Sequence, residues 1–353
     1  MKKSRTKFKT HDLIMLLERL EMYISAGLSL DTALEVMAKG TKDRRQKTSL
    51  EMVRVDINKG FQFHRSLSAH ISISKTTEGL IEHGESSGEL HKSLVTARGL
   101  LEREDELKKK CLSALAYPVI IGLFAIILTI GLVRGVMPQI IPMLKGLHVQ
   151  LPLLTRIVIY ISDHIVSSGV YILIGIIAVS VIHGILFRKY SSYKKMVQSA
   201  LLRVPLVGSM MHAYSLSLFL QSCGSLVESG ISVATAYVST SKTITLIPLS
   251  IFFSGHIPDI NRGVQIGTIL ENKSKRIPEY IPSLLTAGEA SGMLGASLIR
   301  AAHIIDRDIE HSLKRLTSLI EPVMMVGIGC VVGGIALSIL MPIYDISKVL
   351  QHT

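Results

Sequence analysis

The sequence has no tryptophan and little aromatic or charged character. Phe, Trp and Tyr together make up 5% of the 353 residues. Asp, Glu, Lys and Arg make up 19%, below the roughly 25% of an average soluble domain. Hydrophobic residues reach 48%, and the mean hydropathy is +0.42. These values argue against an ordinary soluble protein and are typical of a membrane protein that carries polar domains.

Cysteine and the usual catalytic patterns are also scarce. The three cysteines, Cys111, Cys223 and Cys330, form neither a C-x-x-C pair nor an even set, which argues against a disulfide framework and a zinc site. The 13 histidines include no H-E-x-x-H pattern, and no nucleophile-and-base arrangement is found. We therefore expect no catalytic residue, no metal site and no cofactor.

Three uncharged apolar runs are present, at residues 112–133, 170–187 and 323–343. A helix needs about 20 apolar residues to cross the hydrocarbon core of a bilayer, so each run predicts a transmembrane helix. Arg134 follows the first run, where reaching out to the lipid headgroups is the favoured interpretation. For His183, in the second run, a hydrogen-bonded packing role is favoured over a proton relay.

Basic residues set the expected orientation of these spans, because Lys and Arg concentrate in cytoplasmic flanks. The basic flanking residues are Lys108, Lys109, Lys110, Arg188, Lys189, Lys314 and Arg315. They place the N-terminus inside and the C-terminus outside. The net charge of +12 is then explained by an anionic lipid surface, and the basic patches lack the aromatic residues of single-strand nucleic-acid binders.

The predicted spans divide the chain into cytoplasmic and external parts. The expected divisions are a cytoplasmic helical bundle (1–111), transmembrane helix 1 (112–143), a short external loop (144–169), transmembrane helix 2 (170–187), a second cytoplasmic helical bundle (188–321), transmembrane helix 3 (322–343) and an external tail (344–353).

The chain is an internal tandem repeat. Residues 84–90 read GESSGEL and residues 288–294 read GEASGML, and Pro118 and Pro322 have the same spacing of 204 positions. Each repeat therefore includes a soluble part and the apolar run that follows it, with a proline at the membrane entry. Because both copies point the same way, the unpaired middle span must return the chain to the cytoplasm.

Each soluble copy is predicted to be helical. Leu13, Leu16, Leu17, Leu20 and Ile24 form one apolar stripe at helical spacing. Helix-ending glycines are expected at Gly27, Gly60 and Gly84, with Ser29 or Asp31 able to cap the helix that follows Gly27. No sustained alternation indicates a strand, so the fold class is all-α.

The repeated string is predicted to be a corner between two helices. Ser86 and Glu89 have capping-box spacing, and Ser291 is the corresponding candidate cap in the second copy. A phosphate-binding loop would need a lysine and a preceding strand, which neither copy has. The predicted corner residues are Gly84, Glu85, Ser87, Gly88, Gly288, Glu289, Ser291 and Gly292. A structural role is favoured for them over contact with a partner.

Two other features distinguish parts of the repeat. Gly329 and Gly333 have the G-x-x-x-G spacing that lets transmembrane helices approach closely. Residues 41–49 read TKDRRQKTS, whereas the equivalent residues 244–252 read ITLIPLSIF. The apolar segment 244–254 is either buried against the sister domain, a partner or the membrane surface, or is an ordinary part of the core.

The two glycine strings, the YP at 117–118 and the MP pairs at 137–138 and 341–342 resemble the inner-membrane platform proteins of type IV pilus assembly and type II secretion, the PilC/GspF family. The resemblance covers residues 11 to 345. One departure is Glu321, which stands before Pro322 where the first copy has tyrosine.

The resemblance implies two cytoplasmic six-helix bundles with three transmembrane helices in the bacterial inner membrane. It also implies homo-oligomers and a non-enzymatic platform that couples a cytoplasmic hexameric assembly ATPase to extraction and polymerisation of pilin or pseudopilin subunits. Other expected partners are inner-membrane assembly components and membrane lipid, without nucleic acid. The alternatives are a small transporter or channel subunit and a membrane-bound enzyme. The spans offer only Arg134 and His183 as ionisable groups and few polar residues to line a path, which disfavours the transporter.

Overall fold

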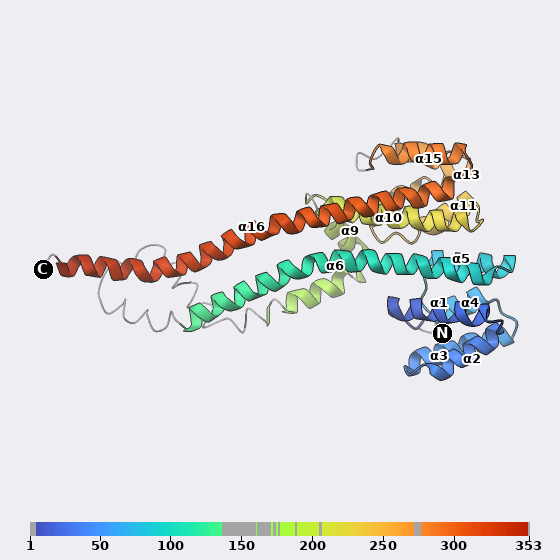
Figure 1. Ribbon diagram of the computed structural model, residues 1–353, viewed down its shortest axis with the longest axis horizontal. Helices are drawn as coiled ribbons and strands as arrows, with labels where there is room; N and C mark the ends of the chain where they lie inside the picture. Colours follow the sequence, from blue (N-terminus) through green and yellow to red (C-terminus); the bar gives the residue numbers. More distant parts are fainter. Residues whose placement is uncertain are drawn as a thin grey trace. The chain divides into compact units, whose positions relative to one another are not determined.

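The computed structural model describes residues 5–135, 160, 171, 174–175, 177–187, 189–204, 207–271 and 277–351. These residues contain no β-strand, and extended backbone pairs in a single bridge between Thr6 and Ile71. The all-α prediction is therefore confirmed for this part of the chain (Figure 1). The chain divides into two compact units, one of residues 1–110 and 195–312 and one of residues 111–194 and 313–353.

The first copy consists of five short helices and a long one. They are α1 (Thr10–Ser25), α2 (Leu30–Gly40), α3 (Arg44–Asn58), α4 (Phe63–His70), α5 (Lys75–Ser87) and α6 (Leu90–Gly135). The apolar stripe predicted for the first helix is buried at Leu13, Leu16, Leu17 and Leu20, and burial of such a stripe is what stabilises an amphipathic helix in water. Ile24, at its end, is half-buried.

The second copy repeats this order after one additional helix. Its helices are α9 (Ser191–Leu201), α10 (Val207–Glu228), α11 (Val233–Ser241), α12 (Ile247–Gly255), α13 (Ile257–Asn261), α14 (Ile266–Glu271), α15 (Tyr280–Ala290) and α16 (Leu294–Gln351). At the repeat spacing, α10 corresponds to α1, α11 to α2, α14 to α4, α15 to α5 and α16 to α6. The counterpart of α3 is divided into α12 and α13 at Gly255 and His256, two residues before Pro258, which lacks the N–H that a continuous helix needs.

The same residues end and begin helices in both copies. Ser29 and Ser232 each accept a hydrogen bond from the backbone N–H three residues later, as N-cap residues do. Left-handed backbone occurs at matched glycines, which are Gly27 and Gly230, Gly60 and Gly263, and Gly88 and Gly292. The predictions for Gly27, Gly60 and Ser29 are therefore confirmed.

Two of the predicted spans lie in long helices. Within the described residues, α6 over Leu90–Leu132 and α16 over Leu294–Leu337 are long and apolar enough to cross a membrane. The second predicted span is described mainly over a shorter apolar helical stretch, Ile177–Phe187. Apart from Tyr160, the predicted external loop 144–169 lies outside the described residues, as does the MP pair at 137–138.

Candidate functional site

The first glycine corner lies between α5 and α6, but its residues are distributed differently from the prediction. Helix α5 continues through Gly84 and Glu85 to Ser87, which is exposed. The residue with left-handed backbone is Gly88, with φ +76°. The prediction that Gly84 ends a helix is therefore wrong. In the second copy α15 likewise runs through Gly288, and Gly292 has φ +71°.

Gly84 and Gly288 allow two helices to come into close contact. A Cβ on Gly84 would lie 2.2 Å from the Oγ atom of Ser93 and 2.4 Å from its Cβ atom. The equivalent distances from Gly288 to the side chain of Ser297 are 2.2 and 2.5 Å. Real Cβ atoms do not tolerate such distances, so only glycine fits where α5 packs on α6 and where α15 packs on α16.

Glu85 caps α4, which precedes it in the chain. Its Oε1 atom accepts a hydrogen bond from the backbone N–H of Phe63 (2.6 Å), and Oε2 accepts one from the N–H of His64 (3.0 Å). The N-cap residue of α4, Gln62, makes no side-chain cap bond of its own. A carboxylate from α5 therefore satisfies two donors that the first turn of α4 would otherwise leave unpaired.

The environment of Glu85 holds the carboxylate in its charged form. Burial raises the pKa of Glu85, but the hydrogen bonds from the backbone and ring of His64 and from the backbone of Phe63 outweigh it and place the pKa below its ordinary value. The ring Nδ1 of His64 lies 2.7 Å from Oε2, and because an ionised carboxylate only accepts, Nδ1 must be the donor. Glu85 thus joins α4 to α5.

Glu289 makes a weaker form of the same contact. Its Oε1 atom accepts a hydrogen bond from the backbone N–H of Ile266 at the start of α14 (2.9 Å). The residue equivalent to His64 is Gly267, which supplies no ring donor. The Oε2 atom is buried without a hydrogen-bond partner among the described residues, so the second copy keeps the carboxylate at the helix start with fewer donors.

The predicted caps of the following helices are wrong. Ser86 donates its hydroxyl proton to the carbonyl of His83 within α5, and exposed Glu89 lies 3.5 Å from the Nζ atom of Lys92, so the two form no capping box. Ser291 donates to the carbonyl of Ala287 (2.9 Å) at the end of α15. These serines therefore close the preceding helices and do not begin the next ones.

The long helices α6 and α16 are joined by ion pairs beyond these corners. Arg103 donates to the carboxylate of Asp306 and to the Nε2 atom of His303 (2.7 Å). Burial and the charge of Arg103 lower the pKa of His303. Lys110 lies 2.7 Å from the Oε1 atom of Glu310, and hydrogen bonds to acidic neighbours, first among them Glu310, raise its pKa. The two copies thus contact each other through charged groups.

The structure bears on some of the predictions made for residues within the spans and leaves others as predictions. Pro118 and Pro322 lie inside α6 and α16, which continue past them. No atom lies within 4 Å of a Cβ built on Gly329 or Gly333, so close helix approach at these glycines stays a prediction. His183 shares a 2.8 Å hydrogen bond with the hydroxyl of Tyr193, which agrees with a hydrogen-bonded packing residue.

The apolar segment 244–254 contributes to the core of the second copy. Leu246, Leu249 and Phe253 are buried, although Ile251 is exposed. The ring of Phe253 stacks on that of Phe219 with centroids 3.8 Å apart, and the hydroxyl of Tyr237 donates to the carbonyl of Phe253 (3.1 Å). Three residues of the segment therefore belong to the core of the second copy, and the rest of it is half-buried or exposed.

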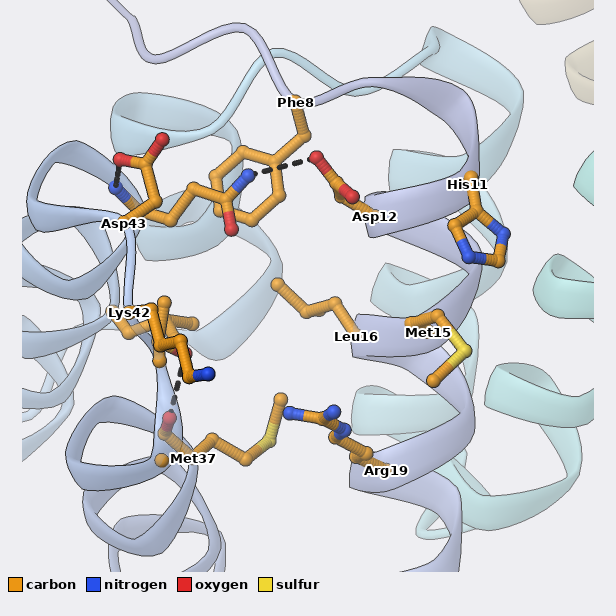
Figure 2. Close-up of a pocket in the computed structure, with 13 residues that line it drawn as sticks. Phe8, His11, Asp12, Met15, Leu16, Arg19, Met37, Lys42 and Asp43 are labelled. Carbon is orange, nitrogen blue, oxygen red and sulfur yellow. Dashed lines mark hydrogen bonds between the residues drawn. The ribbon is translucent and has the colours of Figure 1, made fainter.

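At the equivalent place the first copy contains an open cavity of about 510 Å³. Leu16 and Leu50 occupy the positions of Phe219 and Phe253, and together with Met37 they form a buried apolar floor. Figure 2 shows Leu16 and Arg19 extending from α1 toward Met37 on α2. Sequence reasoning did not predict this cavity; the contrast between residues 41–49 and 244–252 was the signal that could have pointed to it.

The acidic groups of the cavity are already hydrogen-bonded. Gln46 donates its side-chain amide to Asp12 (2.9 Å), and Asp43 accepts from the backbone N–H groups of Arg45 and Gln46 at the start of α3. The hydrogen bonds from Gln46 to Asp12 and to Asp43 appear as dashed lines in Figure 2. Among the described residues, the cavity included, no group of three or more His, Cys, Asp or Glu side chains is placed to hold a metal ion.

Comparison with known proteins agrees with the internal repeat. The family described as type II secretion system (T2SS), protein F matches residues 16–138 and again residues 219–342. The two matched segments begin 203 positions apart and end 204 positions apart, and the glycine corners are likewise 204 positions apart.

Similar proteins cover almost the whole chain. A type IV pilus assembly protein PilC of Thermus thermophilus is 29% identical over 95% of this chain and 82% of its own length. A protein with the same description from Pseudomonas aeruginosa is 21% identical over 97% of this chain and 92% of its own length. A type II secretion system protein F of Aeromonas hydrophila is 24% identical over 97% and 88%. The chain therefore belongs to the type II secretion system protein F family, with two tandem copies of the family domain.

Proposed function

We propose that the chain is a non-enzymatic inner-membrane platform for assembly of a type IV pilus or a type II secretion pseudopilus. The observation that carries this proposal is the double family match at residues 16–138 and 219–342. Each match takes in a soluble helical copy and the long apolar helix that follows it. Relatives described as pilus assembly and secretion proteins match over 95% and 97% of this chain.

The proposed role is mechanical. A cytoplasmic hexameric ATPase acts on the soluble copies, and the resulting movement of the chain extracts pilin subunits from the membrane. Such coupling needs stiff connections. Helices α6 and α16 each continue without interruption from a glycine corner into an apolar stretch. Glu85 and the Arg103–Asp306 pair hold neighbouring helices together, which supports transmission of a displacement along these helices.

The proposed placement in the membrane follows from charge. Lys108, Lys109 and Lys110 precede the apolar part of α6, and Lys314 and Arg315 precede that of α16. The positive-inside rule places both flanks in the cytoplasm. With a middle span at 170–187, this gives three spans, an inside N-terminus and an outside C-terminus.

A gene-deletion experiment tests the proposal. In the bacterium that produces this chain, deletion should abolish surface fibres or the release of a secreted protein, and the wild-type gene should restore them. The tagged chain should also copurify with an assembly ATPase. Intact fibres and intact secretion in the deletion strain would contradict the platform function, and a defect confined to solute uptake would favour a transporter.

A further inference from the structure

Helix α9 begins beside the end of the middle apolar stretch. His183 lies in that stretch, and Tyr193 lies in the first turn of α9, ten residues later. Ten residues of continuous helix would separate the two by about 15 Å, farther than their side chains can span. The ring Nδ1 of His183 nevertheless lies 2.8 Å from the hydroxyl of Tyr193. The chain therefore bends sharply between them, and α9 starts beside the last turns of the apolar stretch.

Two cations at this bend lie over aromatic rings. The Nζ atom of Lys189 is 5.9 Å from the ring centroid of Tyr190, and that of Lys194 is 5.9 Å from the ring centroid of Phe187. In such a pair the lysine stem covers apolar surface while the charged end stays at a polar boundary. Tyrosine at the membrane–water interface and lysine in the cytoplasmic flank are typical of the place where a span ends.

The segment around α9 is basic, and no acidic residue of its own balances the charge. Between Asp163 and Glu228 the sequence contains no aspartate or glutamate. Its five lysines and arginines are Arg188, Lys189, Lys194, Lys195 and Arg203. The last four form no ion pair among the described residues. The segment therefore keeps an uncompensated positive charge.

Helix α9 is fixed to the second copy through its one buried residue, Gln198. The side-chain amide of Gln198 donates to the carbonyl of Thr245 (3.2 Å), and its oxygen accepts from the backbone N–H of Ile247 (2.9 Å) at the start of α12. The connection that receives these bonds, residues 242–247, contains no acidic residue. One side of α9 thus faces the second copy, and the opposite side faces away from it.

The outward side of α9 and the turn after it combine positive charge with exposed apolar groups. Met196 is 63% exposed and Val204 is 45% exposed. Lys195 and Arg203, their neighbours in the chain, are also exposed. Exposed apolar side chains flanked by cations are typical of helices that lie in the surface of a membrane. The first copy has no helix equivalent to α9.

We propose that α9 is an interfacial helix that binds the anionic phospholipid headgroups of the cytoplasmic leaflet. Lys195 and Arg203 contact headgroup phosphates, and Met196 inserts toward the acyl chains. An acidic protein surface would offer the same charge, but the bend at Tyr193 places α9 where lipid is already present. The contact holds the second copy, and not the first, against the membrane. The inference rests on the proposed middle span at 170–187.

Fluorescence quenching in nanodiscs tests the contact with the full chain. Met196 is replaced by the genetically encoded fluorescent amino acid Anap, and the bilayer is an equal mixture of phosphatidylglycerol and phosphatidylcholine with a nitroxide-labelled lipid as quencher. We expect loss of emission from this label. The same label at Met22, which is 54% exposed on α1 of the first copy, should keep its emission and controls for the affinity of the dye itself for lipid.

Removal of positive charge provides the second arm. Lys195→Gln/Arg203→Gln should shift α9 toward the unbound state by about 25-fold, because each basic residue at an anionic surface contributes a factor of about five. Quenching at Met196 should fall accordingly, as it should in nanodiscs of phosphatidylcholine alone. Lys42→Gln/Lys59→Gln is the matched control, since both lysines are exposed in the first copy and the net charge changes equally.

The outcomes separate this contact from the proposed span. Quenching at Met196 that requires phosphatidylglycerol and both Lys195 and Arg203 supports the proposal. Quenching no greater than at Met22, or unchanged by loss of either charge partner, overturns it. A label at Ile182 reports on the span: quenching there with none at Met196 overturns the surface contact alone, and quenching at neither site overturns both. Fibre assembly is no part of this readout, so the platform function is tested separately.

Discussion

The two copies of the repeat share backbone requirements and differ in how they fill space. Gly84 and Gly288 sit against a serine at nearly the same distance, and Gly88 and Gly292 both have left-handed backbone. In the first copy a cavity lies beside Leu16 and Leu50, whereas in the second copy the rings of Phe219 and Phe253 occupy these positions and stack on each other. Positions fixed by backbone geometry have thus been retained, while side-chain packing has diverged.

The glutamate of the repeated string, Glu85 or Glu289, likewise has a shared and a divergent part in the two copies. Glu85 accepts hydrogen bonds from two backbone N–H groups and one imidazole, whereas Glu289 accepts one from the described residues. Both carboxylates lie at the start of a short helix that precedes them in the chain. The shared part is the charge at a helix N-terminus, and the number of donors is what differs.

The largest effect is expected from filling the glycine contact. Gly84→Ala should destabilise the chain by about 2–3 kcal/mol because its Cβ would overlap the side chain of Ser93. The measurement is urea unfolding of the purified chain in lipid nanodiscs, followed by circular dichroism. Gly288→Ala should have a similar effect, since its distances to Ser297 are nearly the same.

The matched control is the double variant Gly84→Ala/Ser93→Gly, which removes the overlapping side chain. It should recover most of the lost stability, with a small remaining cost because the Glu89 carbonyl lies 3.1 Å from the added Cβ. No rescue would mean that the glycine is required for another reason, and a large difference between Gly84→Ala and Gly288→Ala would break the equivalence of the corners.

The ion pair between the copies should have the next largest effect. The side chains of Arg103 and Asp306 are 18% and 15% exposed, so Arg103→Gln leaves a largely buried carboxylate with less compensation. We expect a loss of about 1.5–2.5 kcal/mol in the same urea experiment. The control is Lys59→Gln, which should leave stability unchanged because Lys59 is exposed and forms no ion pair among the described residues. Arg98→Gln/Lys92→Gln is not a suitable control, because Arg98 pairs with Glu21. Equal stability of Arg103→Gln and wild type would show that this ion pair does not stabilise the contact between the copies.

The two glutamates should contribute to stability in the order of the number of hydrogen bonds that each accepts. Glu85→Gln keeps the shape but loses the charge that accepts three donors, and should cost about 1–2 kcal/mol. Glu289→Gln should cost about half as much, or less, because it has one bond to Ile266 and a buried oxygen without a partner. Unfolding midpoints of the two variants, compared side by side, test this order. A larger effect of Glu289→Gln would reverse the comparison.

The smallest effect is a dependence of stability on acid pH. Since the pKa of Glu85 is below its ordinary value of 4.5 in the folded chain, the unfolded chain binds more protons in this range. The contribution of Glu85 is therefore fully present above about pH 4.5 and is lost as the pH falls through the folded pKa. Unfolding midpoints measured from neutral to acid pH should fall less steeply in Glu85→Gln than in wild type, and identical slopes would contradict the assignment.

Local patterns in the sequence predicted most of the helical organisation. Gly27 and Gly60 end helices because a left-handed residue is a local requirement, and Ser29 caps α2 through a bond to its own neighbour. The repeat spacing also predicted that the second copy would follow the same order. Each of these features depends on residues that lie close together in the chain, which is why a sequence pattern reveals them.

Contacts between distant residues could not be predicted in the same way. Gly84 was expected to end a helix, but it is needed for contact with Ser93, nine positions later. The sequence places Glu85 in the corner before α6, yet its carboxylate caps the start of α4, 22 residues earlier at Phe63. The cavity depends on the spacing of α1 from α2 and α3; the contrast between residues 41–49 and 244–252 marks where the copies differ but does not give that spacing.

The central claim is that Glu85 and Glu289 hold helices in place and take no part in chemistry or in a direct coupling contact. The most direct measurement is fibre assembly or secretion by Glu85→Gln/Glu289→Gln, normalised to the amount of folded chain in the membrane. The account predicts that assembly per folded molecule is retained. Complete loss of assembly with a normal amount of folded, membrane-inserted chain would contradict it.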